Sequence, residues 1–261
     1  MRIEVKGKFM TSLFLFAHQD DEFGVFWKIY SLCQTHNRVI IAYLTSGSVS
    51  GQQNPTRDQE SINVLMRLGV ARRDIHFVGA SMSIADGRLP EHFGIAFDAC
   101  MALVKTVNDL AEICSVAWEG GHQDHDACHV VAVIMAKKLR LLERSSQFSL
   151  YHGAGLRGSF FRLFAPLPEN GEISSMKIPL GARLRFSVYP FIYRSQWKSW
   201  IGLYPFMIAH YVFSGNQELQ KFSDKRINVV PHGGKLLYER RGSYSRELFF
   251  QSATSFIALH G

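Results

Sequence analysis

The chain of 261 residues is 47% hydrophobic and 20% charged. This is the composition of an ordinary globular protein with enough apolar residues for one substantial core, so it excludes a disordered or fibrous chain and predicts a single domain over residues 1–261. The formal net charge of +7 is compatible with an acidic substrate, but no C₂H₂ spacing, RNP-like string or concentrated Lys/Arg stripe supports nucleic-acid binding.

Up to about residue 145, short β-rich runs alternate with longer amphipathic segments. Strands are expected at residues 12–18, 38–44, 75–78 and 115–118, and helices at 22–36, 56–68, 92–107 and 125–140. Thr56 is the expected N-cap of its helix, and Gly69 follows the last residue of that helix. The alternation is typical of βαβ units, so we expect an α/β fold with a Rossmann-like, mainly parallel sheet flanked by helices over about residues 10–145.

The pattern changes in a C-terminal extension over about residues 146–261. Short β-like runs at 149–151, 162–164 and 184–193 are separated by glycines, prolines and aromatic residues. These runs predict additional C-terminal strands and loops. Within the extension, Tyr193, Trp197 and Trp200 are candidates either for sugar-stacking surfaces or for plain core packing.

Two features bear on cellular location. Residues 200–213 approach a membrane-spanning stretch, but Pro205 and His210 interrupt them, and the run is shorter than the roughly 18 to 20 residues that a spanning helix needs. We therefore expect no transmembrane segment; a buried helix is expected there, and a membrane-facing patch with peripheral membrane contact is the alternative. The cysteines lie far apart without a C-x-x-C pair, which favours a reducing compartment and a cytoplasmic protein.

Two clusters of histidines and carboxylates follow predicted strands. Residues 17–22 read A-H-Q-D-D-E, and residues 120–125 read G-G-H-Q-D-H. Both clusters stand where a parallel strand ends, which is the sheet edge at which α/β proteins bind ligands. Clustered carboxylates are costly to desolvate unless a cation compensates them, and two histidines with one carboxylate are a recognised hydrolytic zinc set. The sequence therefore predicts a divalent metal site at this edge.

The two clusters resemble the motifs of the PIG-L/LmbE-like zinc-dependent N-acetylglucosaminyl deacetylases, A-H-P-D-D-E near the N-terminus and G-H-x-D-H later. Between them, residues 45–47, 57–60, 68–69 and 86–89 are similar to the family's T-x-G, R-x-x-E, Leu-Gly and D-G-x-L elements. The resemblance is nearly continuous to residue 140; beyond it, only residues 193–196 and 238–241 resemble short motifs of some members. Gln19 and Gln123 stand where proline is common, which bears on loop rigidity rather than on ligands.

The resemblance implies a hydrolase that removes the acetyl group from an N-acetylated amino sugar. In that family's pattern, His18, Asp21 and His125 bind zinc and Asp20 is the general base; the residues alone leave the order of Asp20 and Asp21 open. Zn²⁺ is the expected cofactor, with another divalent metal such as Fe²⁺ as the alternative. The implied partner is a small-molecule or glycan substrate bearing an N-acetyl amino sugar, whose identity the motifs leave open, and no motif speaks to the oligomeric state.

Further roles follow from the same resemblance. A cationic His122 would stabilise the oxyanion or protonate the leaving amine, and Asp124 would orient a histidine. Arg57 and Asp86 are implied substrate contacts. The plainer alternatives are a helical ion pair between Arg57 and Glu60 and an ordinary Asp-Gly turn at residue 86.

Three alternatives stay open at this point. His129 lies one helical turn after His125, so the two could form an H-x-x-x-H metal pair, although a packing role is expected for His129. A non-catalytic metal- or sugar-binding module would keep the metal ligands and dispense with the base. An Fe(II) oxygenase also uses two histidines and a carboxylate, but ligands at the strand ends of an α/β chain count against it.

Overall fold

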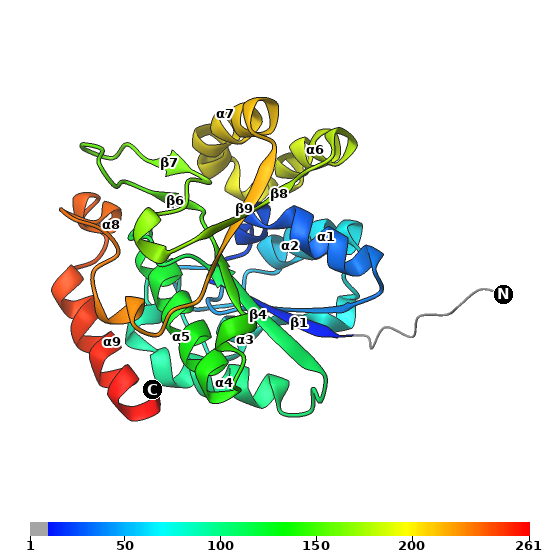
Figure 1. Ribbon diagram of the computed structural model, residues 1–261. Coiled ribbons are helices and arrows are strands. Elements are labelled where there is room, and N and C mark those ends of the chain that lie inside the picture. The colour runs from blue at the N-terminus through cyan, green and yellow to red at the C-terminus, as the bar shows by residue number, and fades with distance from the viewer. Residues whose placement is uncertain (1–9) are drawn as a thin grey trace.

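The structure is a computed structural model that describes residues 10–261; the first nine residues of the expected domain lie outside the described residues. A seven-stranded sheet in the order β3-β2-β1-β4-β5-β9-β8 forms its centre (Figure 1). The parallel strands are β1 (Thr11–Phe16), β2 (Arg38–Tyr43), β3 (Ile75–Phe77), β4 (Leu110–Val116) and β5 (Ser146–Phe148). Strand β9 (Asn216–Lys221) extends the sheet by antiparallel pairing with β5, and β8 (Ile173–Lys177) pairs antiparallel with β9. The expected mainly parallel α/β fold is confirmed.

Helices cover both faces of this sheet. Helices α1 (Phe26–Gln34) and α2 (Pro55–Leu68) pack together on one face, and α4 (Phe93–Val104), α5 (Gln123–Lys138) and α9 (Arg246–His260) pack together on the other (Figure 1). Strand β1 is buried along its whole length, which explains its unbroken run of apolar residues after Ser12: a parallel strand between two helical layers has no solvent face.

The start of α2 differs from the prediction. Its N-cap is Asn54, whose side chain accepts a hydrogen bond from the backbone N–H of Arg57, and Pro55 takes the first helical position. Proline favours that position because its ring fixes a helical φ and its missing N–H needs no partner there, so the cap lies before it rather than at Thr56. The predicted end is confirmed, since Gly69 follows α2 with a left-handed φ of 104°.

The C-terminal extension contains more helix than expected. The strand predicted at residues 184–193 is wrong: α6 (Leu180–Ser187) occupies its first part, and a 3-10 turn, Tyr189–Ile192, occupies the rest. Phe186 of α6 is fully buried and packs against Phe26 and Tyr30 of α1, so tertiary packing overrides the local alternation. The other two runs overlap β6 (Tyr151–His152) and β7 (Arg162–Leu163), which form a separate two-stranded ribbon.

The stretch at residues 200–213 forms most of helix α7 (Trp197–Phe213), so the expected helix is confirmed, but the expectation that it is buried is wrong. A short helix α8 (Leu237–Arg240) precedes α9. Only one side of α7 packs inward, through Trp200, Met207 and Tyr211. Among the helices of residues 10–261, none combines the length and the apolar character needed to cross a bilayer.

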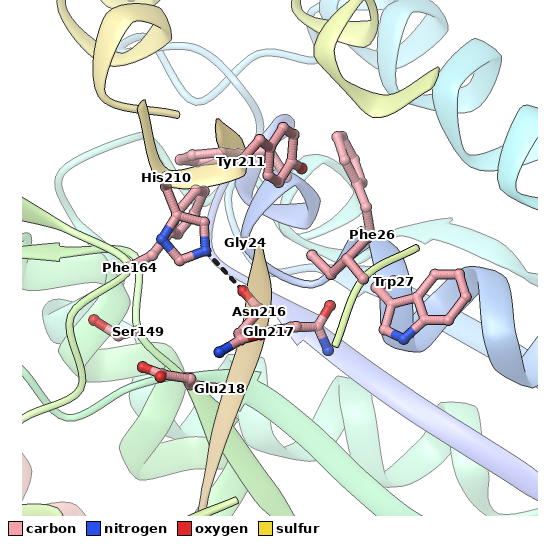
Figure 2. Close-up of a pocket in the computed structure, with 12 residues that line it drawn as sticks. Gly24, Phe26, Trp27, Ser149, Phe164, His210, Tyr211, Asn216, Gln217 and Glu218 are labelled. Atoms are coloured by element: carbon pink, nitrogen blue, oxygen red, sulfur yellow. Dashed lines mark hydrogen bonds between the residues drawn. The ribbon is translucent and has the colours of Figure 1, made fainter. Parts of the chain in front are cut away.

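The extension is fixed to the core where α7 and β9 meet the turn before α1. Figure 2 shows His210 of α7, whose Nε2 donates a 2.7 Å hydrogen bond to the backbone carbonyl of Asn216 in β9. Gly24 lies opposite, and a Cβ at this position would lie 2.6 Å from the Leu150 side chain. The cavity left at this junction is about 20 Å³, the size of one water molecule. The turn that follows the first histidine–carboxylate cluster is therefore tightly packed against the extension.

Candidate metal centre

The two histidine–carboxylate clusters meet at the carboxyl edge of the sheet. Strands β1 and β4 are parallel neighbours, so the residues after Phe16 and after Val116 emerge side by side. His18, which follows β1, and His125, which follows β4, therefore lie close together, with 3.3 Å between His18 Nδ1 and His125 Nε2. Gly120 has a left-handed φ of 69°, and Gly121 lies so close to the Tyr151 carbonyl that a Cβ would clash with it. Both glycines are thus needed for the second cluster to reach the first.

Three side chains of these clusters bring possible metal-ligand atoms close to one another. His125 Nε2 is 3.1 Å from Asp21 Oδ1 and 3.3 Å from His18 Nδ1, and His18 Nδ1 is 3.7 Å from Asp21 Oδ2. Ligands bound at 2.0–2.1 Å around a tetrahedral ion are about 3.4 Å apart. In addition, His125 Nε2 carries at most one hydrogen and cannot form a full hydrogen bond to both His18 Nδ1 and Asp21 Oδ1. The predicted ligands His18, Asp21 and His125 therefore fit a divalent cation.

His122 stands beside this triad as a further candidate ligand. His18, His122 and His125 each offer a ring nitrogen, and these atoms lie within 4.8 Å of one another. However, His122 Nδ1 accepts a hydrogen bond from the Asp124 backbone N–H and caps α5, which leaves its Nε2 for a hydrogen. Burial, followed by the charge of His18, lowers the pKa of His122 to about 3. The structure thus favours a neutral His122 where the family resemblance implied a cation.

Asp124 is fully buried and orients His18. Its Oδ2 is 2.9 Å from His18 Nε2, and its two oxygens accept hydrogen bonds from the backbone N–H groups of Gly87 and Leu89. Burial acts to raise the pKa of Asp124, but the hydrogen bond with His18, the charge of His18 and the hydrogen bond from the Gly87 N–H outweigh it and hold the pKa below its usual value. An anionic partner on Nε2 leaves Nδ1 of His18 free to act as a ligand.

Asp20 has a strained backbone, with a φ of 107° in the left-handed region. Its N–H donates to Glu22 Oε2, and its Oδ1 lies 3.5 Å from Arg57 Nη2. Burial raises the pKa of Asp20 to about 8, although the charge of Arg57 opposes the shift. Non-glycine residues at positive φ cost about 1–3 kcal/mol and cluster at functional sites, and a carboxyl that titrates near neutrality suits a general base.

Arg57 and Asp86 form an ion pair at the rim of the site, with 2.7 Å between Nη1 and Oδ2. The alternative pair between Arg57 and Glu60 is wrong, because Glu60 accepts instead from the backbone N–H and the hydroxyl of Ser195. Asp86 is more than a turn residue, since its Oδ1 also accepts from the backbone N–H of Gly47. Together the pair ties three loops around the site.

These residues line a pocket of about 260 Å³ that the candidate metal ligands share with the extension. Its lining comprises His18, Asp20, Asp21, Phe23, Arg57, Asp86, His122, His125, Tyr151, Gln196, Ser199 and Leu203. Sequence reasoning missed Tyr151, Ser199 and Leu203, which sit in no recognisable pattern. Gln196 had a signal, since it ends the weak motif at 193–196, and its Nε2 donates to the Gln19 carbonyl at 2.8 Å.

The two glutamines that replace the usual prolines are anchored by their side chains. Gln19 is fully buried, and its Nε2 donates to Asp58 Oδ1 at 2.7 Å. Gln123 Nε2 donates to the Gly87 carbonyl, and its Oε1 accepts from the Ser243 hydroxyl. Hydrogen bonds to neighbouring segments thus constrain both loops without a proline ring.

Most of the remaining candidate side chains belong to the protein interior. His129 Nδ1 bonds to the Val116 carbonyl at 2.9 Å, and its ring packs against Phe222, so the packing role expected for it is supported over a metal pair with His125. Tyr193 and Trp200 are buried and stacked on each other. Trp197, by contrast, is 57% exposed.

Comparison with known proteins gives one family match. Residues 13–136 match the model of the PIG-L family, described as GlcNAc-PI de-N-acetylase. No curated protein sequence matches the chain.

Several solved structures share the fold. A zinc-inhibited form of teicoplanin deacetylase superposes with a TM-score of 0.61 at 14% identity, covering 82% of this chain and 100% of that one. For N,N'-diacetylchitobiose deacetylase from Pyrococcus horikoshii the TM-score is 0.57 at 17% identity, with coverage of 85% and 87%. The A40926 pseudoaglycone deacetylase gives 0.59 at 16% identity, with coverage of 80% and 96%. Both motifs of the centre lie inside the matched residues 13–136, so this part of the chain is similar to the PIG-L family.

Proposed function

We propose that the protein is a metal-dependent hydrolase that removes the acetyl group from the amide nitrogen of an N-acetylated amino sugar. The observation that carries the proposal is that His18, Asp21 and His125 contact one another in a pocket that Asp20 also lines. Burial raises the pKa of this Asp20 carboxyl to about 8. A metal-binding module would need the first three residues but would have no use for a strained, buried Asp20.

Zn²⁺ is the metal that this donor set favours, because two imidazole nitrogens and one carboxylate are a usual hydrolytic zinc set; Fe²⁺ is the alternative. When bound, zinc lowers the pKa of a coordinated water towards ~7 and polarises an amide carbonyl. His18, Asp21 and His125 would hold it. Asp124 keeps His18 in the required tautomer through the hydrogen bond at Nε2.

In this mechanism, Asp20 transfers the proton and His122 stabilises the oxyanion. Asp20 takes a proton from the attacking water, and its raised pKa allows it to hold that proton near neutral pH. His122, neutral and with Nδ1 occupied by the Asp124 N–H, donates a hydrogen bond from Nε2 to the oxyanion that forms on the acetyl oxygen. The proton held by Asp20 then goes to the amine as the C–N bond breaks, which yields acetate and a free amino sugar.

The rim of the pocket supplies the substrate contacts. Arg57 and Asp86 line the pocket and present a guanidinium and a carboxylate, groups that can hydrogen-bond sugar hydroxyls. Solved structures of the same fold are named for deacetylation of teicoplanin and of N,N'-diacetylchitobiose, so an N-acetyl amino sugar is the substrate class we assign. We further propose a cytoplasmic location, which the free thiols of Cys33, Cys100, Cys114 and Cys128 support.

The decisive experiment incubates the purified protein, reconstituted with Zn²⁺ or Fe²⁺, with a panel of N-acetyl amino sugars in free, nucleotide-linked, lipid-linked and glycopeptide form. We expect release of acetate and free amine in equal amounts, loss of this activity with a chelator, and recovery when the metal is returned. Stoichiometric metal binding without acetate release from any member of the panel would instead identify a non-catalytic metal- or sugar-binding module.

A further inference from the structure

The outward side of α7 is almost wholly apolar. Its large exposed side chains are Trp197, Ile201, Phe206, Val212 and Phe213, with exposures of 57%, 66%, 51%, 64% and 87%. They recur at helical spacing opposite the inward-packing side. Large exposed apolar patches mark interaction sites on soluble proteins, so this helix face calls for a partner.

The apolar face continues onto the neighbouring 3-10 turn. Phe191 of that turn is 64% exposed and its ring contacts Tyr204 of α7. Together with Trp197 and Ile201, these side chains line a concavity of about 440 Å³. The surface is therefore a broad, hollowed patch rather than a single row of side chains.

The chain segment that carries this patch has charged residues of one sign. Residues 173–217 contain no aspartate or glutamate, and their basic residues are Lys177, Arg183, Arg185, Arg194 and Lys198. Arg194 and Lys198 are exposed beside Trp197, and neither has an acidic partner within 4.0 Å among residues 10–261. Free cations at the edge of an apolar patch are complementary to a partner that is both apolar and anionic.

We propose that this face, called the α7 face and comprising Phe191, Arg194, Trp197, Lys198, Ile201, Phe206 and Phe213, docks the protein on an anionic phospholipid bilayer. Aromatic and aliphatic side chains insert at the headgroup–acyl boundary, while Lys and Arg attract anionic headgroups. A second copy of this chain is a poorer occupant, because a two-fold contact through the same face would bring its unpaired cations together.

Docking through the α7 face would place the pocket beside the membrane. Ser199 and Leu203, within a turn of Trp197 and Ile201 on the same helix, line the catalytic pocket. Figure 1 shows α7 and α6 together at one end of the molecule, away from α9. The inference does not rest on the proposed deacetylase activity, since it concerns a surface that contains none of the proposed ligands or catalytic residues.

Vesicle flotation with the full chain tests the proposal. We expect the protein to bind phosphatidylcholine vesicles that contain phosphatidylglycerol, to bind pure phosphatidylcholine vesicles much less, and to release at high salt. The double variant Ile201→Ser/Phe206→Ser should lose at least about tenfold in apparent affinity, and Lys198→Ala about fivefold. The matched control is Leu248→Ser/Leu259→Ser on α9, whose side chains are 55% and 79% exposed; it should bind like the parent chain.

Tryptophan fluorescence provides a second readout that does not depend on the double variant. Anionic vesicles should shift the emission to the blue, and Trp197→Phe should abolish the shift. The proposal is overturned if no vesicle binding occurs, if the α9 control weakens binding equally, or if sedimentation velocity shows a dimer that Ile201→Ser/Phe206→Ser dissociates.

Discussion

Asp20 is held in its strained backbone conformation by contacts to the residues on either side of it. The carbonyl of Gln19 accepts hydrogen bonds from Arg57 Nη2 at 3.1 Å and from Gln196 Nε2 at 2.8 Å. The N–H of Asp20 is bound by Glu22. Strain of this kind persists only where surrounding structure enforces it, so these contacts fix the position of the proposed base.

Replacing Asp20 separates catalysis from metal binding. Asp20→Asn should lower turnover by about a hundredfold or more, the usual range for loss of a general base, and should retain the metal because His18, Asp21 and His125 are untouched. The matched control Asp21→Asn should lose the metal as well as the activity. Acetate release and metal content by mass spectrometry check both variants. Unchanged turnover in Asp20→Asn would remove Asp20 from the mechanism.

A second pair of residues separates metal ligation from packing. His125→Ala should abolish stoichiometric metal binding, because its Nε2 contacts both His18 and Asp21. His129→Ala should keep the metal and lower the free energy of unfolding, since it removes the hydrogen bond to the Val116 carbonyl and the packing of the ring against Phe222. Equal metal loss in both variants would favour an H-x-x-x-H pair over the ligand set proposed here.

At the level of elements, the sequence predicts the core strands and the metal ligands for one physical reason. A strand covered on both faces, such as β1, must be apolar throughout, and a charged cluster after it stands out. Strand β9 has no such signal, because its residues Asn216–Lys221 are mostly polar and become strand only by pairing with β5 and β8. The same dependence on tertiary contacts explains why α6 was mistaken for a strand.

Close packing between elements near the site yields a stability prediction. Gly79 in α3 (Val78–Ser81) touches the backbone of Leu44 at the end of β2, where a Cβ would clash. Gly79→Ala should therefore lower the free energy of unfolding by about 1–3 kcal/mol. Gly94 in α4 has open space around its Cα, so Gly94→Ala should raise it by about 0.4–1 kcal/mol. Urea unfolding measures both, and a destabilisation of equal size in the two variants would contradict the packing argument.

For the whole molecule, the core and the C-terminal extension together line the pocket. The core supplies the proposed ligands and the proposed base, while Tyr151, Gln196, Ser199 and Leu203 close the pocket from beyond residue 145. Sheet strands from both parts are hydrogen-bonded through the pairing of β4 with β5. We therefore propose that residues 10–261 form one folding unit rather than a catalytic domain with a separate appendage.

The charge balance of the metal site predicts how stability changes with pH. Burial raises the pKa of Asp20 to about 8, so in the metal-free protein its carboxyl binds a proton more tightly when folded than when unfolded. The stability that the protonated Asp20 carboxyl contributes is fully present below its unfolded pKa of about 4. This stability is lost as the pH rises through the folded pKa of about 8. The pKa of His18 is also raised, because hydrogen bonds to Asp124 and Asp21 outweigh its burial, and it acts in the same direction.

The metal-free protein should therefore lose stability between pH 7 and pH 8.5, a window in which unfolded histidines are already mostly neutral. Asp20→Asn should show a smaller loss, because it removes the carboxyl that must ionise. Added Zn²⁺ should raise the urea midpoint by binding only the folded state, and more so at the higher pH, since a cation compensates the ionised carboxylates. Urea midpoints at the two pH values measure these effects. A midpoint for the metal-free parent that stays constant or rises would show that Asp20 is ionised in the folded protein throughout this range.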